Sequence, residues 1–373
     1  MAREPMFSIR VGAMVATAAA LACLVLATLA GLGYLVPTLA GLRRRRPPRR
    51  APTHTFTILI PAHNEALALP RTLASLAALD YPPELVRVCV VADNCTDRTA
   101  AVARRAGARC LVRHDPGNRG KGFALAFGIA RVLETAPDVV LVLDADCELN
   151  PGALRALGAT FATGAAAVQA AVRSANADDG PSGLVAAVGT AFDAGTAAGW
   201  DALGFSVPLR GTGMAFRSAV LERVPWAAFG AVEDAEYAGR LKRSGVRVRY
   251  CPGAEVTCEA PASVGELCRQ RRRWRGAGLL ASKPLVLGLV AISIGAGWAC
   301  GFVGWAAALL AVFGGLYLRA LLAVGLTRRR FGALVRAPAV VGRLGLVTLA
   351  GVFRGAAAWD RPARAVNSIR RAG

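Results

Sequence analysis

Charged side chains are scarce in this chain of 373 residues. Only 18% of them are Asp, Glu, Lys or Arg, where an ordinary soluble domain carries about a quarter. Hydrophobic residues make up 54%, and the mean hydropathy is +0.43. This composition excludes an intrinsically disordered chain and argues against a wholly soluble enzyme. The length excludes a small disulfide scaffold and leaves room for one large domain with membrane segments.

Acidic residues are outnumbered by basic ones, 24 to 45, which gives a net charge of +21. The excess lies outside the central region: residues 43–50 contain six Arg and no acid, whereas residues 51–268 carry a net charge of −2. From residue 269 to the end, 17 Lys or Arg face a single acid, Asp360. A nucleic-acid-binding domain would place the excess on its globular part. We therefore expect membrane lipids as partners, and no nucleic acid.

Cysteines are few and scattered. The nine of them form no C-x-x-C pair and do not cluster with the three histidines. We expect reduced thiols that pack as small apolar side chains in the cytoplasm.

Two long stretches lack charge altogether. Residues 11–42 exceed the ~20 residues that span a bilayer and are followed by the Arg-rich stretch, which favours a retained helix near 12–34 over a cleaved signal peptide. Residues 285–318 are long enough for two helices joined near Gly301–Gly304. We expect an integral protein of a bacterial-type inner or plasma membrane, with its N-terminus outside and its basic loops inside.

A third apolar stretch, 332–358, contains Arg336, Arg343 and Arg354. Their spacing places all three on one face of a helix. If this helix crossed the membrane, the basic tail after it would lie outside, against the positive-inside rule. We therefore predict an amphipathic helix on the cytoplasmic surface. The expected organisation is a membrane helix in 1–42, a basic linker 43–52, a cytoplasmic domain 53–282, two membrane helices in 283–326, and the surface helix with its tail in 327–373.

The region 53–282 alternates short apolar runs with helical patterns, which predicts an α/β domain with a mostly parallel sheet and helices on both faces. Asn150 and Pro151 are expected to begin one helix as N-cap and first residue. The expected strands are 56–60, 86–92 and 139–143, and the expected helices are 66–79, 97–106 and 120–134.

Carboxylates follow the predicted strands, at the edge where such sheets bind ligands. They are Glu65, Asp93, Asp144 and Asp146. Two residues apart at a strand end, Asp144 and Asp146 point the same way and suit Mg²⁺ or Mn²⁺ on a phosphate. The alternative is a solvated pair of loop acids.

Three further segments allow two interpretations each. Glu233 and Asp234 open a helix, where they either stabilise its N-terminus or supply a general base, Asp234. The segment Gly211-Thr212-Gly213 is either a plain turn or a close backbone approach to a ligand. Residues 118–122, which include Lys121, precede a helix and could touch a nucleotide, although they form no Walker motif.

A capping box, Ser263-x-x-Glu266, opens another predicted helix. Gln270 and Arg273 share a face of this helix, and Trp274 follows. Arginines beside a membrane are commonly anchors, yet this face could also bind a diphosphate, with Trp274 as a stacking surface for a sugar.

Together these motifs resemble those of membrane-bound family 2 glycosyltransferases with the GT-A fold, over residues 53–282. Similar members include cellulose-synthase-like and exopolysaccharide enzymes and ceramide glucosyltransferases. The motifs follow the family's order: Pro61–Glu65, Ala92–Asn94, Gly120–Gly122, Asp144–Asp146, Gly211–Gly213, Glu233–Asp234 and the Q-x-x-R-W-type run Gln270–Trp274.

The resemblance implies inverting transfer from a nucleotide-sugar, most often a UDP-sugar. Glu65 and Asp93 would hold the nucleoside, and Asp146 with Asp144 would hold Mg²⁺ or Mn²⁺ on the diphosphate. Asp234 would be the general base, Arg273 would stabilise the leaving diphosphate, and Trp274 would form the floor of the acceptor site. Lys121, the segment 211–213, Glu233 and Gln270 complete the expected substrate site.

The sequence departs from the family pattern at two points. Asn94 stands where many members have a second Asp, and the gating segment of cellulose synthases is not seen. The missing segment argues against a processive enzyme of that type, and three spanning helices are few for a polymer channel. We therefore expect transfer to a lipid-linked or polysaccharide acceptor in cell-envelope glycan synthesis. The alternatives are a ceramide or other glycolipid glucosyltransferase and, from another class, a non-catalytic membrane scaffold.

Overall fold

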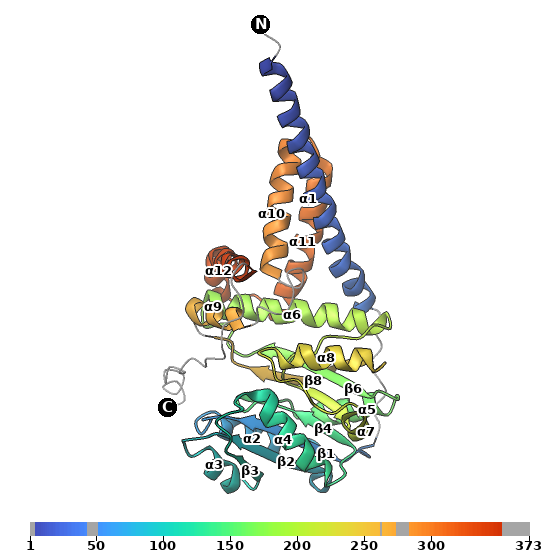
Figure 1. Cartoon of the computed structure of the whole chain (residues 1–373), viewed down its shortest axis with the longest axis vertical. Coiled ribbons are helices and arrows are strands. Elements are labelled where there is room, and N and C mark those ends of the chain that lie inside the picture. The colour runs from blue at the N-terminus through green and yellow to red at the C-terminus, as the bar shows by residue number, and fades with distance from the viewer. Residues whose placement is uncertain (1–3, 43–50, 262, 274–282, 353–373) are drawn as a thin grey trace.

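The computed structural model describes residues 4–42, 51–261, 263–273 and 283–352. An α/β domain forms one end of the molecule, and a bundle of long helices rises from it (Figure 1). The strands are β1 (Phe56–Ala62), β2 (Val86–Asp93), β3 (Arg109–Arg113), β4 (Val139–Val142), β5 (Cys147–Leu149), β6 (Ala167–Ser174), β7 (Met214–Arg217) and β8 (Val248–Cys258). The helices are α1 (Glu4–Leu42), α2 (Leu69–Ala77), the 3₁₀ helix η1 (Pro83–Leu85), α3 (Thr99–Arg105), α4 (Lys121–Leu133), α5 (Ala153–Phe161), α6 (Pro181–Ala202), α7 (Ser218–Arg223), α8 (Glu233–Arg243), α9 (Val264–Arg273), α10 (Lys283–Ala299), α11 (Val303–Val324) and α12 (Arg328–Val352).

The eight strands form one sheet in the order β3-β2-β1-β4-β7-β6-β8-β5. Its first four strands are parallel, and β7 and β5 run antiparallel to their neighbours. The chain thus has the mixed, mostly parallel sheet of a Rossmann-like domain, as predicted. Because β1, β2 and β4 run in one direction, the carboxylates that follow them meet at one edge.

Helices cover both faces of the sheet, which explains why the central strands are apolar throughout. On one face α2 and α5 share a hydrophobic core with Ile58 and Ile60, and on the other α4 and α8 share a second core with Leu59. These three β1 side chains are fully buried.

One expected helix start is wrong. Helix α5 begins at Ala153 with Gly152 as its N-cap, and Asn150 lies in the preceding turn. The Asn150 side chain instead accepts a hydrogen bond from the Glu255 N–H (2.7 Å) and donates one to the Gly253 carbonyl (3.3 Å). It therefore fastens this turn to β8, an interaction that local sequence does not reveal.

Helices α1, α10 and α11 run side by side away from the domain (Figure 1). The break between α10 and α11 falls at residues 300–302, where Gly301 has φ +83°. Helix α6 lies across the base of this bundle, and α1 packs closely on it: a Cβ at Gly199 would collide with the backbone of Pro37. The glycine therefore lets the two helices touch.

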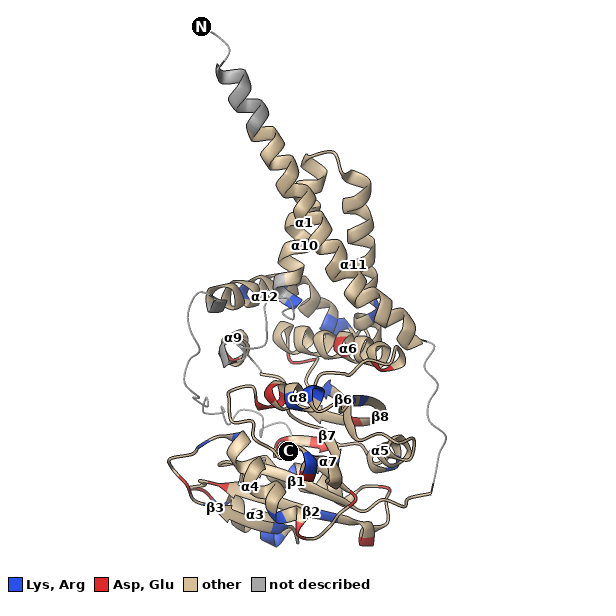
Figure 2. Cartoon of the chain, turned by 45° about the vertical axis from the view of Figure 1, so that its right-hand side comes forward, with Lys and Arg blue, Asp and Glu red and all other residues tan. Residues whose placement is uncertain are grey.

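Three described helical segments are long and apolar enough to cross a membrane: Gly12–Leu42, Val303–Val324 and Arg328–Ala350. Helix α10 is apolar, but shorter than that. By length and composition, α12 therefore qualifies as a membrane span, whereas the sequence predicts a helix on the membrane surface. In the structure α12 runs across the bundle beside α6 and α9 (Figures 1 and 2), and its Val340 and Leu344 pack with Leu267 of α9.

Candidate functional site

A lysine connects the groups at the centre of the carboxyl edge. Lys121, the first residue of α4, places its Nζ 2.5 Å from Asp144 Oδ1 and 3.6 Å from Glu233 Oε1. The same ammonium donates a hydrogen bond to the Gly211 carbonyl (2.8 Å). Burial lowers the pKa of Lys121, but Asp144, Glu233 and the nearby Asp234 outweigh it and raise the pKa overall. This lysine therefore stays charged.

The segment Gly211–Gly213 shapes the middle of the site. Gly211 has φ +77° and Gly213 has φ +65°, a region that favours glycine. A Cβ at Gly213 would lie 2.8 Å from Val256 Cγ2, so no side chain fits there. Between them, Thr212 is buried, and its hydroxyl accepts a hydrogen bond from the Asp144 N–H (3.1 Å). The turn thereby fixes the backbone of the first acidic residue.

Asp234 stands at the N-terminus of α8, close to this turn. A Cβ built on Gly211 would be 3.7 Å from Asp234 Oδ2 and 3.4 Å from Lys121 Nζ. Burial raises the pKa of Asp234, although the Ala235 N–H and the charges of Lys121 and Arg210 oppose the shift. A half-buried carboxylate with a raised pKa suits a general base.

Asp144 and Asp146 form the second acidic group. Their carboxylates and the Cys147 sulfur lie within 4.8 Å of one another. Burial raises the pKa of Asp144, with Lys121 opposing and Asp146 adding to the shift. Two carboxylates this close fit a hard divalent cation such as Mg²⁺ or Mn²⁺, which would relieve their mutual repulsion.

The expectation that all cysteines are reduced is wrong for one pair. Cys147 and Cys258 form a disulfide between neighbouring residues of β5 and β8. The two cysteines are 111 residues apart in the sequence, so local pattern does not predict their pairing. With its sulfur bridged, Cys147 does not add a thiolate to the donor set, which leaves the two carboxylates.

Glu65 and Asp93 lie at the ends of β1 and β2, and both are buried. Asp93 Oδ1 is 2.6 Å from Arg113 Nη1, in an ion pair with side-chain exposures of 6% and 9%. The Glu65 N–H donates a hydrogen bond to Thr99 Oγ1 (2.8 Å). Asn94, which stands where many family members have a second Asp, has φ +49° and donates hydrogen bonds to Asp93 Oδ1 and the Asp115 carbonyl, both at 3.2 Å. It helps to shape this end of the site.

A second charged cluster was not predicted. Arg210 directly precedes the glycine turn, and its Nη1 is 2.9 Å from Asp193 Oδ2 on α6. Lys283, the first residue of α10, lies 2.7 Å from the same oxygen. The Arg210 N–H donates a hydrogen bond to the buried Gln169 side chain (2.9 Å). The cluster links the glycine turn to the base of the bundle. In the sequence, the only sign of this cluster is that Arg210 directly precedes Gly211.

The remaining predicted residues belong to α9. The Ser263 Oγ accepts a hydrogen bond from the Glu266 N–H (3.2 Å), as a capping residue does. Gln270 is half-buried on this helix. Arg273 is its last residue, but its side chain lies outside the described part of the chain, as do Trp274 and Arg354.

The arrangement thus brings together Lys121, Asp144, Asp146, Thr212, Glu233 and Asp234, with glycines at 211 and 213. It offers a base and a lysine beside Gly211 of the glycine turn, with the paired carboxylates next to the lysine. Such a site can deprotonate a hydroxyl beside a metal-bound anion.

Comparison with protein families gives a match to the family described as "Glycosyltransferase like family 2" over residues 52–277. Among curated proteins, "Probable glycosyltransferase YdaM" of Bacillus subtilis is 30% identical over 58% of this chain and 54% of its own length. "Beta-monoglucosyldiacylglycerol synthase" of a Synechocystis species is 28% identical over 59% of this chain and 47% of its own. The chain therefore spans about half the length of these two relatives.

Among solved structures, a mannosyltransferase of Pyrobaculum calidifontis in complex with GDP-mannose and Mn²⁺ is similar, with a TM-score of 0.56. The similarity covers 90% of this chain and 99% of that one, at 20% sequence identity. It supports the same fold over most of the chain.

Proposed function

The chain belongs to glycosyltransferase family 2, and from that premise we propose that it transfers a sugar from a nucleotide-sugar, a UDP-sugar, to a lipid-linked or glycan acceptor at the membrane face. One observation carries the proposal: the Asp234 carboxylate and the Lys121 ammonium both lie against Gly211, the lysine in contact with Asp144. A base and a diphosphate-binding group thus flank one small space.

In the proposed reaction, Asp234 accepts the proton of the acceptor hydroxyl. The freed oxygen attacks the anomeric carbon from the side opposite the diphosphate, and the bond from that carbon to the diphosphate oxygen breaks with its electron pair. A nucleoside diphosphate leaves, and the anomeric configuration inverts. The absence of a side chain at Gly211 lets the acceptor oxygen approach Asp234.

The leaving diphosphate carries the charge that develops. Asp144 and Asp146 would hold Mg²⁺ or Mn²⁺, which supplies positive charge to the diphosphate oxygens when bound. Lys121 adds a fixed charge, and Thr212 and Gly211 hold Asp144 and the lysine in place through their hydrogen bonds. Glu65 and Asp93 bind the nucleoside in this scheme, and Gln270 contributes from α9. Arg273 at the diphosphate and Trp274 at the acceptor remain predictions from the sequence.

The membrane is the expected location of the acceptor. Described segments of the chain could span a bilayer. We propose that α1, α10 and α11 cross it, with the domain in the cytoplasm and the N-terminus outside, because the basic stretches 43–50, 269–283 and 328–330 then all lie inside. The Cys147–Cys258 disulfide is the one feature that a reducing compartment would not favour.

A glycolipid acceptor is the second candidate, because one relative is named a monoglucosyldiacylglycerol synthase. A test of both uses the purified full chain in lipid nanodiscs, with UDP- and GDP-sugars as donors. Diacylglycerol, ceramide and polyprenyl phosphate serve as acceptors, and products are identified by mass spectrometry.

We expect one UDP-sugar to be consumed with a divalent cation present, and the activity to disappear in EDTA and in Asp146→Ala. Asp179→Ala, which removes a carboxylate from the turn before α6, serves as the control. Undiminished turnover in EDTA would remove the metal from the proposal, and no turnover with any donor would reject the activity itself.

A further inference from the structure

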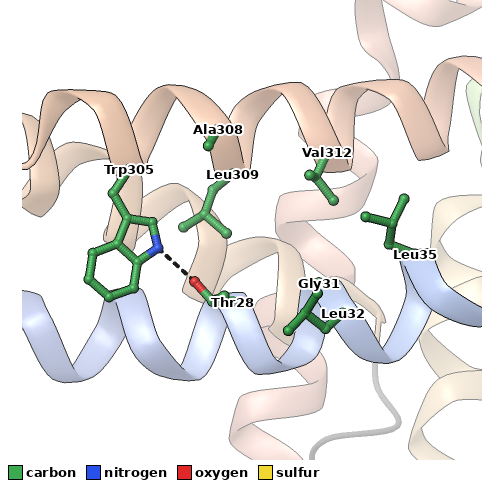
Figure 3. Close-up of a pocket in the computed structure, with 8 residues that line it drawn as sticks. All are labelled: Thr28, Gly31, Leu32, Leu35, Trp305, Ala308, Leu309 and Val312. Atoms are coloured by element: carbon green, nitrogen blue, oxygen red, sulfur yellow. Dashed lines mark hydrogen bonds between the residues drawn. The ribbon is translucent and has the colours of Figure 1, made fainter.

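An apolar groove runs between α1 and α11 on the helical bundle (Figure 3). It holds about 350 Å³, including the part open to the surroundings. The small residues Gly31 of α1 and Ala308 of α11 lie on opposite walls of the groove. The lining residues are Thr28, Gly31, Leu32 and Leu35 of α1, and Trp305, Ala308, Leu309 and Val312 of α11.

The groove offers no polar group to a ligand. Its only hydroxyl, on Thr28, accepts a hydrogen bond from the Trp305 indole N–H (2.7 Å), which closes one end (Figure 3). Both helices belong to the segments that are long and apolar enough to cross a membrane. At that depth the available apolar ligand is the hydrocarbon chain of a lipid.

A cation stands at the end of the groove that faces the domain. Arg319 follows Val312 by seven residues and Trp305 by fourteen, so the three lie on one face of α11. Seven residues correspond to about 10 Å along the helix. A Cβ on Gly195 of α6 would collide with the Arg319 guanidinium, so the charge rests directly on that helix.

Arg319 differs from the other cations at this level. Lys283 pairs with Asp193 and Arg330 pairs with Asp178. Within the described parts of the chain, no carboxylate lies within ion-pair distance of Arg319. A half-buried arginine inside an apolar span is costly and calls for a partner. The phosphate of an anionic lipid supplies one at this depth.

We propose that the bundle binds an anionic glycerophospholipid, with one acyl chain in the groove and its phosphate at Arg319. Charge complementarity favours an anionic headgroup, because a zwitterionic lipid carries its own cation. This lipid is distinct from the sugar acceptor, since α6 lies between the bundle and the helix that carries Asp234 (Figure 1). It ties α11 to α6 and so fastens the domain to the membrane.

Trp305 provides the readout, because it lines the groove. The full chain is placed in nanodiscs that contain phosphatidylglycerol or phosphatidylcholine with brominated acyl chains, at equal mole fraction in unlabelled phosphatidylcholine. Quenching of Trp305 is the difference between the chain and its Trp305→Phe variant. We expect brominated phosphatidylglycerol to quench several-fold more effectively than brominated phosphatidylcholine.

Three variants decide the origin of the preference. Arg319→Gln should abolish it, Arg319→Lys should keep most of it, and Ala308→Phe should weaken quenching by both lipids because it fills the groove. Arg131→Gln, an equal charge change at an exposed residue of α4 in the α/β domain, is the control and should leave the preference intact. Equal quenching by the two lipids, or a preference that survives Arg319→Gln, would overturn the proposal whether or not the chain transfers sugar.

Discussion

The two carboxylate clusters at the edge of the sheet are neutralised in different ways. Asp93 pairs with Arg113, and both side chains are almost fully buried; the same guanidinium also pairs with Asp115 (2.7 Å). Asp144, Glu233 and Asp234 instead share Lys121, with Asp146 beside them. In the first, which we call the closed cluster, one cation serves two carboxylates. In the second, the open cluster, one cation stands among four carboxylates. The excess negative charge of the open cluster favours binding of a divalent cation, which can in turn bind a diphosphate.

The largest effect should come from the open cluster. Asp234→Asn removes the proposed base but keeps the size of the side chain. Turnover should fall by about 10²–10⁴-fold, the usual contribution of a placed base, while donor affinity, measured by calorimetry, changes little. Glu236→Gln is the matched control, since its carboxylate accepts hydrogen bonds from Phe229 and Gly230 and faces a loop.

The same variant also tests the electrostatics. Because burial raises the pKa of Asp234, folding favours its protonated form, and this stabilisation is lost as the pH rises through the raised pKa. Asp234→Asn should therefore have a Tm at neutral pH at least as high as that of the parent chain. A lower Tm together with lost turnover would point to misfolding rather than to a missing base.

The closed cluster should respond through stability. Arg113→Gln leaves Asp93 buried without its cation, a change that costs about 3–5 kcal/mol in comparable pairs. Lys121→Gln should cost less, because burial already raises the pKa of Asp144 and lets it take up a proton. Thermal unfolding of both variants in nanodiscs at neutral pH measures the difference. A larger loss for Lys121→Gln would reverse the comparison of the two clusters.

The helix α12 extends the comparison to the membrane. Arg336 and Arg343 are exposed, while Val340 and Leu344 are buried against α9. If α12 lies on the surface beside the acceptor, replacing both arginines by Gln should raise the acceptor KM. Each contributes about 1 kcal/mol near an anionic surface, so the rise should stay within about 30-fold.

Donor hydrolysis and membrane retention should not change in this double variant, since α1 and α11 still hold the chain. Unchanged acceptor kinetics would leave α12 as a plain anchor. Labelling of a cysteine introduced at Arg371 by an impermeant reagent from outside would instead show that α12 spans the membrane.

The parts that sequence predicted are those set by local pattern. Strands β1, β2 and β4 follow from apolar runs, and the helix at Glu233 from its acidic first turn. Long-range pairing was not accessible: Arg113 against Asp93, Asn150 against β8, and Cys147 against Cys258 join residues 20 to 111 positions apart. Nothing local distinguishes these side chains from solvated ones. Likewise, whether α12 spans depends on its packing, which composition does not encode.

The smallest expected effect is a shift in the pH dependence of activity when Arg210 is replaced. This residue links the glycine turn to α6 at the base of the helical bundle. Because the pKa of Asp234 is raised, the acid limb of kcat/KM should lie above the ~3.9 of an ordinary Asp. The positive charge of Arg210 lowers the pKa of Asp234 and so favours its charged form. Arg210 acts from a distance, because its guanidinium is itself paired with Asp193.

Arg210→Gln should therefore move the acid limb to higher pH, by less than the ~1–3 units of a direct ion pair, and Arg210→Lys should restore it. Because Arg210 is also a structural contact of α6, the pH profile is the informative measurement: a merely structural role would lower kcat at every pH without displacing the limb. If the acid limb does not move in Arg210→Gln, Arg210 does not set the pKa of Asp234. Only Lys121 and the carboxylates of the open cluster would then do so.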